Sequence, residues 1–272
     1  MIRLGLIGYP LAHSLSPALH QAALDAFDLP GEYLLYPVAP DDPVSLAGLL
    51  DRVRSGVLRG LNVTIPYKQA IIPFLDALNP VARVTGAVNT IYRKDGILWG
   101  DNTDAPAFLS DLGRFLAKPQ YAIVLGAGGA ARSVVHGLQD WRCSISLVAR
   151  RTEQARSLTE QFGNIQVIAL TPETLRKTDV DLIVNTTPVG MFPDVDRSPW
   201  PASLPFPDEA CVYDLIYNPR ETLLARRARA AGLKAITGLG MLIEQAGLAF
   251  ELWTGREVQR SLLWDAAQQL VQ

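Results

Sequence analysis

The chain has 272 residues, a hydrophobic content of 49% and a formal net charge of −2 at pH 7. This length suits one or two domains with a sizeable core, and the small charge gives no electrostatic case for binding nucleic acid or an anionic membrane. No apolar run is long enough to span a bilayer, so no membrane segment is expected. The short, glycine-rich N-terminus does not resemble a signal peptide. We therefore expect a cytoplasmic protein.

Cysteine and histidine are scarce and show no metal-binding spacing. The two cysteines, Cys143 and Cys211, fall in predicted strands and are expected to be buried thiols. The three histidines, His13, His20 and His136, are too scattered to form a ligand pattern. The sequence therefore predicts no metal site.

The first part of the chain alternates predicted strands and helices. A helix is expected to begin at Ser16, with Ser16 as its N-cap and Pro17 in its first turn. Asp95-Gly96 predicts a hairpin between two strands. The other elements are strands over 2–7, 32–38, 58–64, 87–93 and 97–99 and helices over 41–55 and 67–78.

The stretch 121–135, YAIVLGAGGAARSVV, organises the second part. An apolar strand runs into a glycine turn and then into a helix, and the spacing fits the G-x-G-x-x-G/A fingerprint of dinucleotide-binding βαβ units. Gly126 would allow the sharp turn, Gly128 would let a pyrophosphate approach the backbone, and Ala131 would let helix and strand pack closely. The helix N-terminus would offer free N–H groups to phosphates. The predicted cofactor-binding residues of this turn are Gly126, Ala127, Gly128, Gly129, Ala130 and Ala131.

From this stretch onward, strands and helices alternate in a six-strand, doubly wound pattern. After a helix over 104–116 and a linker at Lys118-Pro119, strands are expected over 121–125, 144–149, 165–169, 181–185, 211–215 and 234–236. Helices are expected between them over 129–140, 152–162, 172–177 and 220–231. Residues 188–207 contain six prolines and are expected to form a loop at the carboxyl end of a strand.

Two amphipathic tail helices, over 241–253 and 258–271, follow the completed sheet. We therefore expect them to pack back on the N-terminal part. The predicted fold is α/β, with an N-terminal α/β substrate domain (1–104) completed by the C-terminal helices (238–272). The inserted domain (105–237) is a doubly wound, Rossmann-type, dinucleotide-binding domain.

Four short polar stretches at element ends stand out in the first part: 13–16 (HSLS), 62–68 (NVTIPYK), 87–90 (AVNT) and 101–104 (DNTD). Each also has a purely structural explanation, since such residues cap helices, close turns or occupy exposed first turns. Together they supply neutral hydroxyl and amide groups, one amine and one carboxylate. That combination suits the binding of a small polyhydroxylated molecule and the transfer of one proton.

These stretches resemble the shikimate dehydrogenase family. HSLSP, NVTIPYK, GAVNT, GDNTD, GAGGAA, NTTPVGM, YDLIYNPRET and GLGMLIEQA occur in the family's order, from residue 5 to about residue 250. The resemblance implies a substrate domain, a dinucleotide domain and an active-site cleft between them. It also implies reversible NADPH-dependent reduction of 3-dehydroshikimate to shikimate, in the shikimate pathway of aromatic amino-acid biosynthesis.

The resemblance makes Lys68 and Asp104 the catalytic pair. Oxidation of a secondary alcohol sends a hydride to the nicotinamide and a proton to a base, and Lys68 can be that base. Asp104 would be its partner and an acceptor for a substrate hydroxyl. The implied substrate-binding residues are Ser14, Ser16 and Tyr217 for the carboxylate and Asn62, Thr64, Asn89 and Gln245 for the hydroxyl groups.

The residues at the end of the second strand of the βαβ unit indicate whether NAD or NADP is bound. NAD enzymes usually place an acid there, whereas this chain has Arg150-Arg151-Thr152, which suits the 2′-phosphate of NADP. An exposed helix start explains the same residues, and Arg150 stands where the family commonly has Asn. By resemblance, the nicotinamide contacts are expected from Thr186, Pro188, Met191, Leu215, Gly238 and Met241.

The residues thus favour an NADP-dependent shikimate dehydrogenase. A quinate/shikimate dehydrogenase that uses NAD or both cofactors remains an alternative. A catalytically silent NADP-binding sensor is disfavoured, because both Lys68 and Asp104 are present. The partners expected are shikimate and NADP, with no nucleic acid and no membrane, and the chain is expected to be a monomer or a homodimer.

Overall fold

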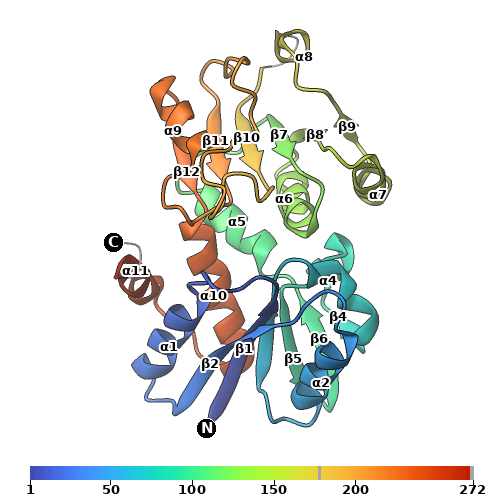
Figure 1. Ribbon diagram of the computed structural model, residues 1–272, viewed down its shortest axis with the longest axis vertical. Coiled ribbons are helices and arrows are strands. Elements are labelled where there is room, and N and C mark those ends of the chain that lie inside the picture. The colour runs from blue at the N-terminus through green and yellow to red at the C-terminus, as the bar shows by residue number, and fades with distance from the viewer. Residues whose placement is uncertain (177–178, 270–272) are drawn as a thin grey trace. The chain divides into compact units, whose positions relative to one another are not determined.

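The computed structural model describes residues 1–176 and 179–269 and divides into two compact units (Figure 1). Unit 1 comprises Met1–Ala107 and Ile243–Gln272, and unit 2 comprises Phe108–Leu242. The boundaries fall inside two helices, α5 (Asp104–Leu112) and α10 (Leu239–Thr254). The use of these units as substrate and dinucleotide domains stays a prediction. Residue 177 of one predicted helix and residues 270–271 of the predicted tail helix lie outside the described residues.

Unit 1 is built on a mixed six-stranded sheet of order β2-β1-β3-β5-β6-β4. The pairs β1–β2, β1–β3 and β4–β6 are parallel, and β3–β5 and β5–β6 are antiparallel. The strands are β1 (Ile2–Gly8), β2 (Gly31–Pro37), β3 (Gly60–Val63), β4 (Ala77–Leu78), β5 (Thr90–Lys94) and β6 (Ile97–Asp101). The other helices are α1 (Ser16–Ala26), α2 (Pro43–Arg54), α3 (Tyr67–Ala70), α4 (Pro80–Thr85), α11 (Arg260–Gln268) and the 3₁₀ turn η1 (Ile72–Phe74).

Each face of this sheet packs against helices, so alternate strand residues point to different cores. On one face, Ile7 and Leu61 pack with α2 residues such as Leu50. On the other face, Leu4 packs with Trp253 of α10. Helix α11 lies against α1, and the Arg59 guanidinium donates from Nε to the Trp253 carbonyl at 2.6 Å. The tail therefore packs on the N-terminal part.

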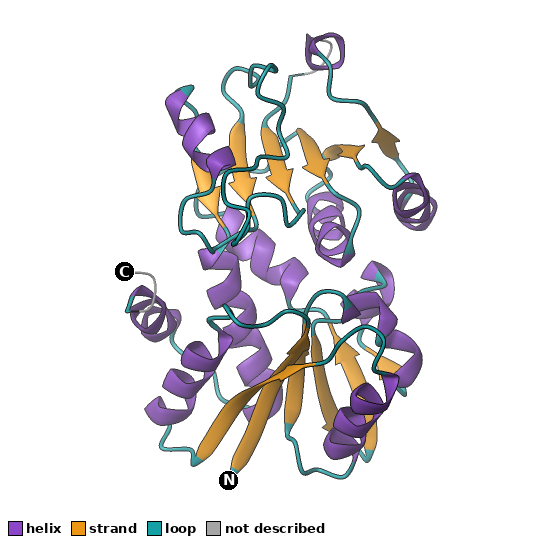
Figure 2. Cartoon of the chain, in the orientation of Figure 1, coloured by secondary structure: helices purple, strands orange, loops and turns teal. Residues whose placement is uncertain are grey.

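Unit 2 is built on an all-parallel, Rossmann-type sheet of order β12-β11-β10-β7-β8-β9, in which helices connect successive strands except between β10 and β11, where a long loop does (Figure 2). A six-strand, doubly wound sheet was predicted from the strand–helix repeat. The strands are β7 (Tyr121–Leu125), β8 (Ser144–Val148), β9 (Ile165–Val167), β10 (Leu182–Asn185), β11 (Cys211–Asp214) and β12 (Ala235–Thr237). The helices are α6 (Gly129–Asp140), α7 (Thr152–Phe162), α8 (Pro172–Arg176) and α9 (Leu223–Ala230).

Local sequence signals explain several element ends. Helix α2 begins after Asp42, whose side chain accepts a hydrogen bond from the Ser45 N–H at 3.0 Å. Helix α9 begins after Thr222, which caps it in the same way. The predicted hairpin joins β5 and β6, with Asp95 and Gly96 both at positive φ.

Three predictions for the first part are wrong. Residues 67–78 do not form one helix but α3, η1 and β4, because Pro73 cannot donate to a helical ladder and Ala77–Leu78 pairs with β6. Ser16 does not cap α1: it lies inside the helix, and its N–H donates to the Ser14 hydroxyl at 3.3 Å. Helix α5 ends at Leu112 rather than at residue 116, and Gly113 follows directly.

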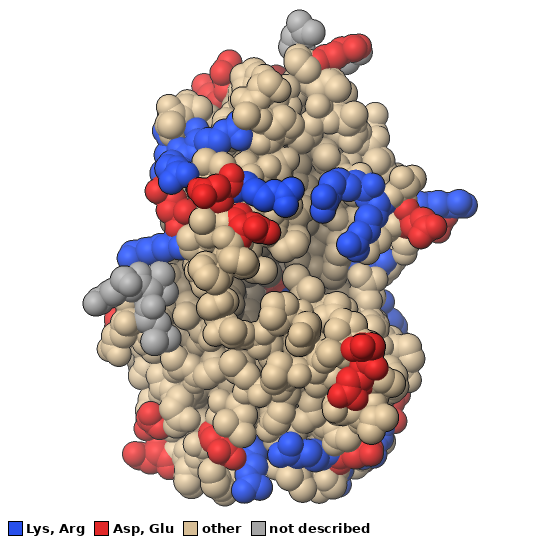
Figure 3. Space-filling view, viewed as in Figure 1, with Lys and Arg blue, Asp and Glu red and all other residues tan. Residues whose placement is uncertain are grey.

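The surface carries no single dominant charge on the side drawn in Figure 3, where Lys and Arg occur together with Asp and Glu. This agrees with the formal net charge of −2. Within residues 1–176 and 179–269, no helix has the length and hydropathy needed to cross a membrane.

Candidate active site

Lys68 and Asp104 form a largely buried ion pair in unit 1. Lys68 lies in the short helix α3 directly after Pro66, and Asp104 is the first residue of α5. The Lys68 Nζ donates to Asp104 Oδ2 at 2.6 Å, and the two side chains are only 15% and 5% exposed. Because this pair is shielded from water, its attraction is stronger than that of a surface pair. The pair predicted from sequence is therefore assembled within one unit.

Asn89 holds this pair in a network of neutral polar groups. Its Nδ2 donates to Asp104 Oδ1 at 2.9 Å and to Thr103 Oγ1 at 2.8 Å. A longer contact of 3.4 Å joins the same nitrogen to Gln245 Oε1 on α10. The Asn89 Oδ1 accepts from the Thr103 N–H and from the Thr90 hydroxyl. Donation by an amide orients the carboxylate and leaves its other oxygen for Lys68.

The backbone beside the pair is also fixed. The Val88 N–H donates to the Lys68 carbonyl at 2.7 Å, and the Asn89 N–H donates to the Asp101 carbonyl at 3.0 Å. These bonds tie α3 and β6 to the segment that carries Asn89. Lys68 and Asp104, which lie in helices α3 and α5, and Asn89, which directly precedes β5, are therefore held by fixed backbone, which favours a single geometry.

Asn62 lies in β3 and contacts the same network from a buried position. Its Nδ2 donates to the Asn89 carbonyl at 3.1 Å and to the Thr90 hydroxyl at 3.2 Å. Its Oδ1 accepts from the Tyr33 hydroxyl at 2.8 Å. Both amide hydrogens of Asn62 thus form hydrogen bonds within the protein, and these bonds help to position Asn89.

The predicted carboxylate-binding serines occupy the start of α1. Ser16 is buried on the inner face of the helix, and Ser14 is partly buried just before it. Thr64 is also partly buried, one residue beyond the end of β3, and its N–H donates to the Ile7 carbonyl. All three belong to unit 1. Tyr217 belongs to unit 2, so its predicted role beside Ser14 and Ser16 stays a prediction.

The glycine turn of unit 2 has the conformation that its spacing predicts. Gly126 has φ +109°, and a Cβ there would lie 2.6 Å from Thr186 Oγ1, so a side chain is excluded. A Cβ on Gly128 would meet no atom within 4 Å, so the backbone is open to a bound group. Ala131 is fully buried under the sheet. No side chain caps the first turn of α6, so its backbone N–H groups are available to bind an anionic group.

Arg150, Arg151 and Thr152 lie where β8 ends and α7 begins, and all three are exposed. Within the described part of the chain, neither arginine forms an ion pair. Two free guanidinium groups at the second strand of a βαβ unit fit the 2′-phosphate of NADP, because a phosphate binds their N–H donors well.

The other predicted cofactor residues line the ends of neighbouring strands in unit 2. The Thr186 hydroxyl donates to the Leu125 carbonyl at 2.7 Å, directly beside the glycine turn. Gly238 packs so closely on Leu215 that a Cβ would lie 2.0 Å from the Leu215 carbonyl oxygen. Met241 is buried, which also agrees with a plain core role. Pro188 and Met191 are exposed in the proline-rich loop, joined by a bond from the Met191 N–H to the Pro188 carbonyl.

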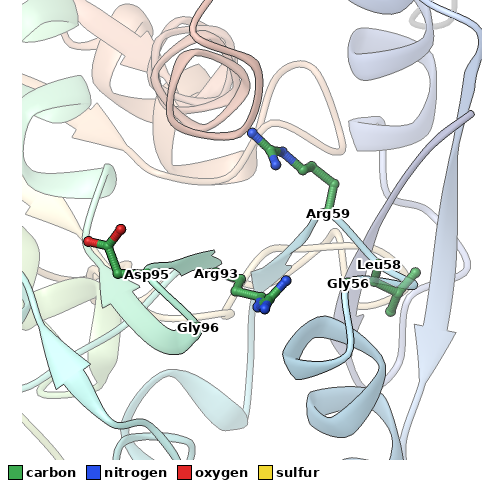
Figure 4. A pocket seen from close by; sticks show the side chains of 6 residues that line it. All are labelled: Gly56, Leu58, Arg59, Arg93, Asp95 and Gly96. Atoms are coloured by element: carbon green, nitrogen blue, oxygen red, sulfur yellow. The ribbon is translucent and has the colours of Figure 1, made fainter.

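A separate cavity of about 300 Å³ lies at the hairpin end of unit 1 (Figure 4). None of the predicted site residues lines it. The residues labelled in Figure 4 come from the β5–β6 hairpin and from the segment between α2 and β3. We therefore do not assign it to the candidate active site. The lining residues are Gly56, Leu58, Arg59, Arg93, Asp95 and Gly96.

Three residues of the network are absent from the predicted site. Thr90 and Thr103 lie inside recognised polar stretches, and their hydroxyl groups contact Asn89. The polar stretches were the sequence signal that could have identified these two threonines. Tyr33 had no such signal, because an aromatic residue within a strand is typical of the core; its contact with Asn62 spans 29 residues of sequence.

A buried amine–carboxylate pair among neutral polar groups, together with a parallel sheet and its glycine turn, is typical of a nicotinamide-dependent oxidoreductase built from two units. Comparison with known proteins identifies the family. One family model, the shikimate dehydrogenase substrate binding domain, matches residues 6–91. A second, the shikimate 5'-dehydrogenase C-terminal domain, matches residues 238–268.

Curated relatives match over nearly the whole chain. Shikimate dehydrogenase (NADP(+)) of Oleidesulfovibrio alaskensis is 41% identical over 269 residues, which cover 96% of this chain and 94% of the relative. The Thermus thermophilus enzyme of the same name is 42% identical and covers 98% of each chain. A crystal structure of the Thermus thermophilus shikimate 5-dehydrogenase with NADP(H) and shikimate superposes with a TM-score of 0.88, covering 99% of this chain and 100% of that one at 41% identity. The chain belongs to the shikimate dehydrogenase (NADP+) family.

Proposed function

We propose that this chain catalyses the reversible NADPH-dependent reduction of 3-dehydroshikimate to shikimate. The observation that carries the proposal is the Lys68–Asp104 pair, held at 2.6 Å inside a network of amides and hydroxyls. This arrangement supplies one exchangeable proton and several groups that bind hydroxyls. The names of the relatives and the order of the shared motifs support the same reaction.

Lys68 is the proton donor in the direction of reduction. Its ammonium group gives a proton to the carbonyl oxygen as the ketone becomes an alcohol, and in the reverse direction the neutral amine takes that proton back. Asp104 holds the amine in place through Oδ2, while Asn89 fixes the carboxylate through Oδ1. Asp104 also accepts a hydrogen bond from a substrate hydroxyl.

The remaining polar residues bind and orient the substrate. Ser14 and Ser16 bind its carboxylate through neutral hydroxyl groups, assisted by Tyr217. These bonds are weaker one by one than those of an arginine fork, so several are needed. The substrate hydroxyls are bound by Asn62, Thr64, Asn89 and Gln245.

Unit 2 holds NADP, which when bound exchanges the hydride with the substrate carbon. Gly128 leaves room for the pyrophosphate, because a Cβ there would point into open space, and Gly126 allows the sharp turn beside it. Arg150 and Arg151, with the Thr152 hydroxyl, bind the 2′-phosphate. The ends of β10, β11 and β12 form the nicotinamide side, through Thr186, Pro188, Met191, Leu215, Gly238 and Met241.

On this proposal the two units have separate tasks. Residues 1–104 and 238–272 form the substrate domain and 105–237 the NADP domain, a division supported by the family model for substrate binding over residues 6–91. Location in the cytoplasm and a monomeric or homodimeric state are part of the same proposal.

Initial rates with shikimate and quinate, each with NADP and NAD, test this function. We expect the highest kcat/KM for shikimate with NADP. A higher kcat/KM for quinate with NAD would make the chain a quinate/shikimate dehydrogenase instead. NADP binding without turnover of either substrate would leave only a binding role.

A further inference from the structure

Behind the proposed active site, Tyr33 and His20 form a buried stacked pair. Tyr33 lies in β2 and His20 in α1, and they are 5% and 1% exposed. Their ring centroids are 4.4 Å apart with an interplanar angle of 9°. The Trp253 ring of α10 packs against both, 5.2 Å from His20 and 6.4 Å from Tyr33. Two helices, α1 and α10, therefore hold the Tyr33 ring in one position.

His20 contributes to this pair as a neutral ring. Burial lowers its pKa to about 3, with a side-chain hydrogen bond to Asn62 acting in the opposite direction. Its Nε2 has no hydrogen-bond partner in the described structure. His20 lies one helical turn after Ser16 on the same buried face of α1. It thereby anchors the helix that carries the proposed carboxylate-binding serines to Tyr33.

The Tyr33 hydroxyl donates to Asn62 Oδ1 at 2.8 Å, and this bond acts together with the His20 hydrogen bond to the same side chain to set which way the Asn62 carboxamide points. An asparagine side chain has an acceptor and a donor end of nearly equal size, so only its partners select the orientation. With the oxygen held by Tyr33, the nitrogen faces the Asn89 carbonyl and the Thr90 hydroxyl. The rotated carboxamide would place its oxygen against the Asn89 carbonyl, which is unfavourable.

The orientation of Asn62 in turn affects the orientation of Asn89. The Thr90 hydroxyl accepts from Asn62 and therefore donates to Asn89 Oδ1, at 3.1 Å. The Thr103 N–H donates to the same oxygen at 2.8 Å, and with its oxygen held by both donors Asn89 presents its nitrogen to Asp104 Oδ1. A continuous series of hydrogen bonds thus joins the Tyr33 hydroxyl to the carboxylate that binds Lys68.

We propose that Tyr33 is a positioning residue for the Lys68–Asp104 pair, acting through the orientation of Asn62 and then of Asn89. The inference rests on the proposed dehydrogenase function. Tyr33 does not touch the reacting groups. It reinforces the arrangement of amide donors and acceptors in which the carboxylate receives an N–H from Asn89, an arrangement that the Thr103 N–H also favours.

Replacement Tyr33→Phe removes the hydroxyl and keeps the ring that stacks on His20. We expect kcat/KM for shikimate to fall about tenfold, mostly in kcat, which corresponds to a typical coupling energy between groups in one network. Tyr92→Phe is the matched control. Tyr92 packs against the same core cluster as Tyr33, and its hydroxyl also bonds an asparagine, Asn79 at 2.9 Å, outside this series. The control should keep wild-type kcat.

A double-mutant cycle separates positioning from general loss of stability. In an Asn62→Ala background, Tyr33→Phe should cause no further loss of kcat/KM, because its effect passes through Asn62. Side-chain amide NMR gives a reading without turnover. The Asn62 and Asn89 NH₂ resonances, assigned in the wild-type chain, should move in Tyr33→Phe and stay in place in Tyr92→Phe. If Asn62→Ala does not fold, this comparison of amide resonances tests the positioning role on its own.

The wild-type rate with shikimate and NADP is measured first, because its absence would refute the proposed function and not the hydrogen-bond series. With an active wild type, three results overturn the positioning role. They are an unchanged kcat in Tyr33→Phe, equal losses with and without Asn62, and unmoved amide resonances.

Discussion

Asp214 is a fully buried carboxylate at the end of β11 in unit 2, and its burial makes the stability of the protein depend on pH. Its Oδ1 accepts from Asn185 Nδ2 at 2.9 Å and from the Ile216 N–H at 3.1 Å. Its Oδ2 accepts from the Thr222 hydroxyl at 2.7 Å. No cation is among these partners. Burial therefore outweighs the hydrogen bonds and raises the pKa of Asp214 from 3.8 to about 6.

A carboxyl group whose pKa is raised by folding stabilises the folded state fully only below its unfolded pKa. That stability is lost as the pH rises from 3.8 through about 6, because the folded chain then holds a proton that the unfolded chain has released. Each pKa unit corresponds to about 1.4 kcal/mol. The loss above pH 6 is therefore about 3 kcal/mol for this one group.

Asp214→Asn removes the titration and keeps most of the hydrogen bonds. The amide oxygen can still accept from Asn185 and Ile216, and the Thr222 hydroxyl can rotate to accept from the new NH₂ group. The absolute stability will shift by about 1 kcal/mol in either direction, so the pH dependence is the quantity to compare.

The assay is urea unfolding of wild type and Asp214→Asn at a series of pH values from 4 to 7.5. We expect the free energy of unfolding of the variant to fall less over this range than that of the wild type, by up to about 3 kcal/mol. Asp208→Asn, which changes an exposed carboxylate of the same unit, should follow the wild-type curve. Parallel curves for wild type and Asp214→Asn would refute the reasoning.

Four further substitutions test the site and the packing. Lys68→Ala should lower kcat by roughly 10²–10⁴-fold with the KM for shikimate nearly unchanged, and unaltered turnover in steady-state assays would remove Lys68 from the mechanism. Arg151→Ala should raise the KM for NADP about tenfold but not the KM for NAD; equal effects on both would argue against a 2′-phosphate contact. Gly238→Ala should destabilise the chain by about 1–3 kcal/mol in urea unfolding, since its Cβ would lie 2.0 Å from the Leu215 carbonyl oxygen. Gly48→Ala, on an exposed helix face with no atom within 4 Å of the new Cβ, should instead stabilise by up to about 1 kcal/mol.

Periodic patterns made unit 2 predictable. Each strand there is a short apolar run that ends in a turn signal, and each helix has a capping or small residue at its start, so local preference and tertiary structure agree. The helices over 129–140 and 152–162 have the predicted bounds. The glycine turn was also predictable from local sequence, because its conformation excludes a side chain at Gly126 and therefore requires glycine there.

The first part of the chain was harder because its elements depend on partners distant in sequence. Residues 67–78 have helix-like spacing, but Ala77–Leu78 forms a strand because β6 is there to pair with it. Helix α4 was not predicted; it has only six residues and ends at Gly86, which has φ +59°. Such short elements carry little periodicity of their own, so tertiary contacts decide them.

The two halves of the proposed reaction depend on different parts of the chain, which makes their variants separable. Every hydrogen bond described for the Lys68–Asp104 network comes from residues of unit 1, including Gln245 from the tail helix α10. Folding of unit 1 therefore assembles the proton-transfer groups, and the binding of cofactor to unit 2 is not needed to create them. A substitution in the glycine turn should then change the KM for NADP while shikimate binding, measured without cofactor, stays as in the wild type. A change at Asn89 should have the opposite pattern, because it alters the carboxylate that holds Lys68.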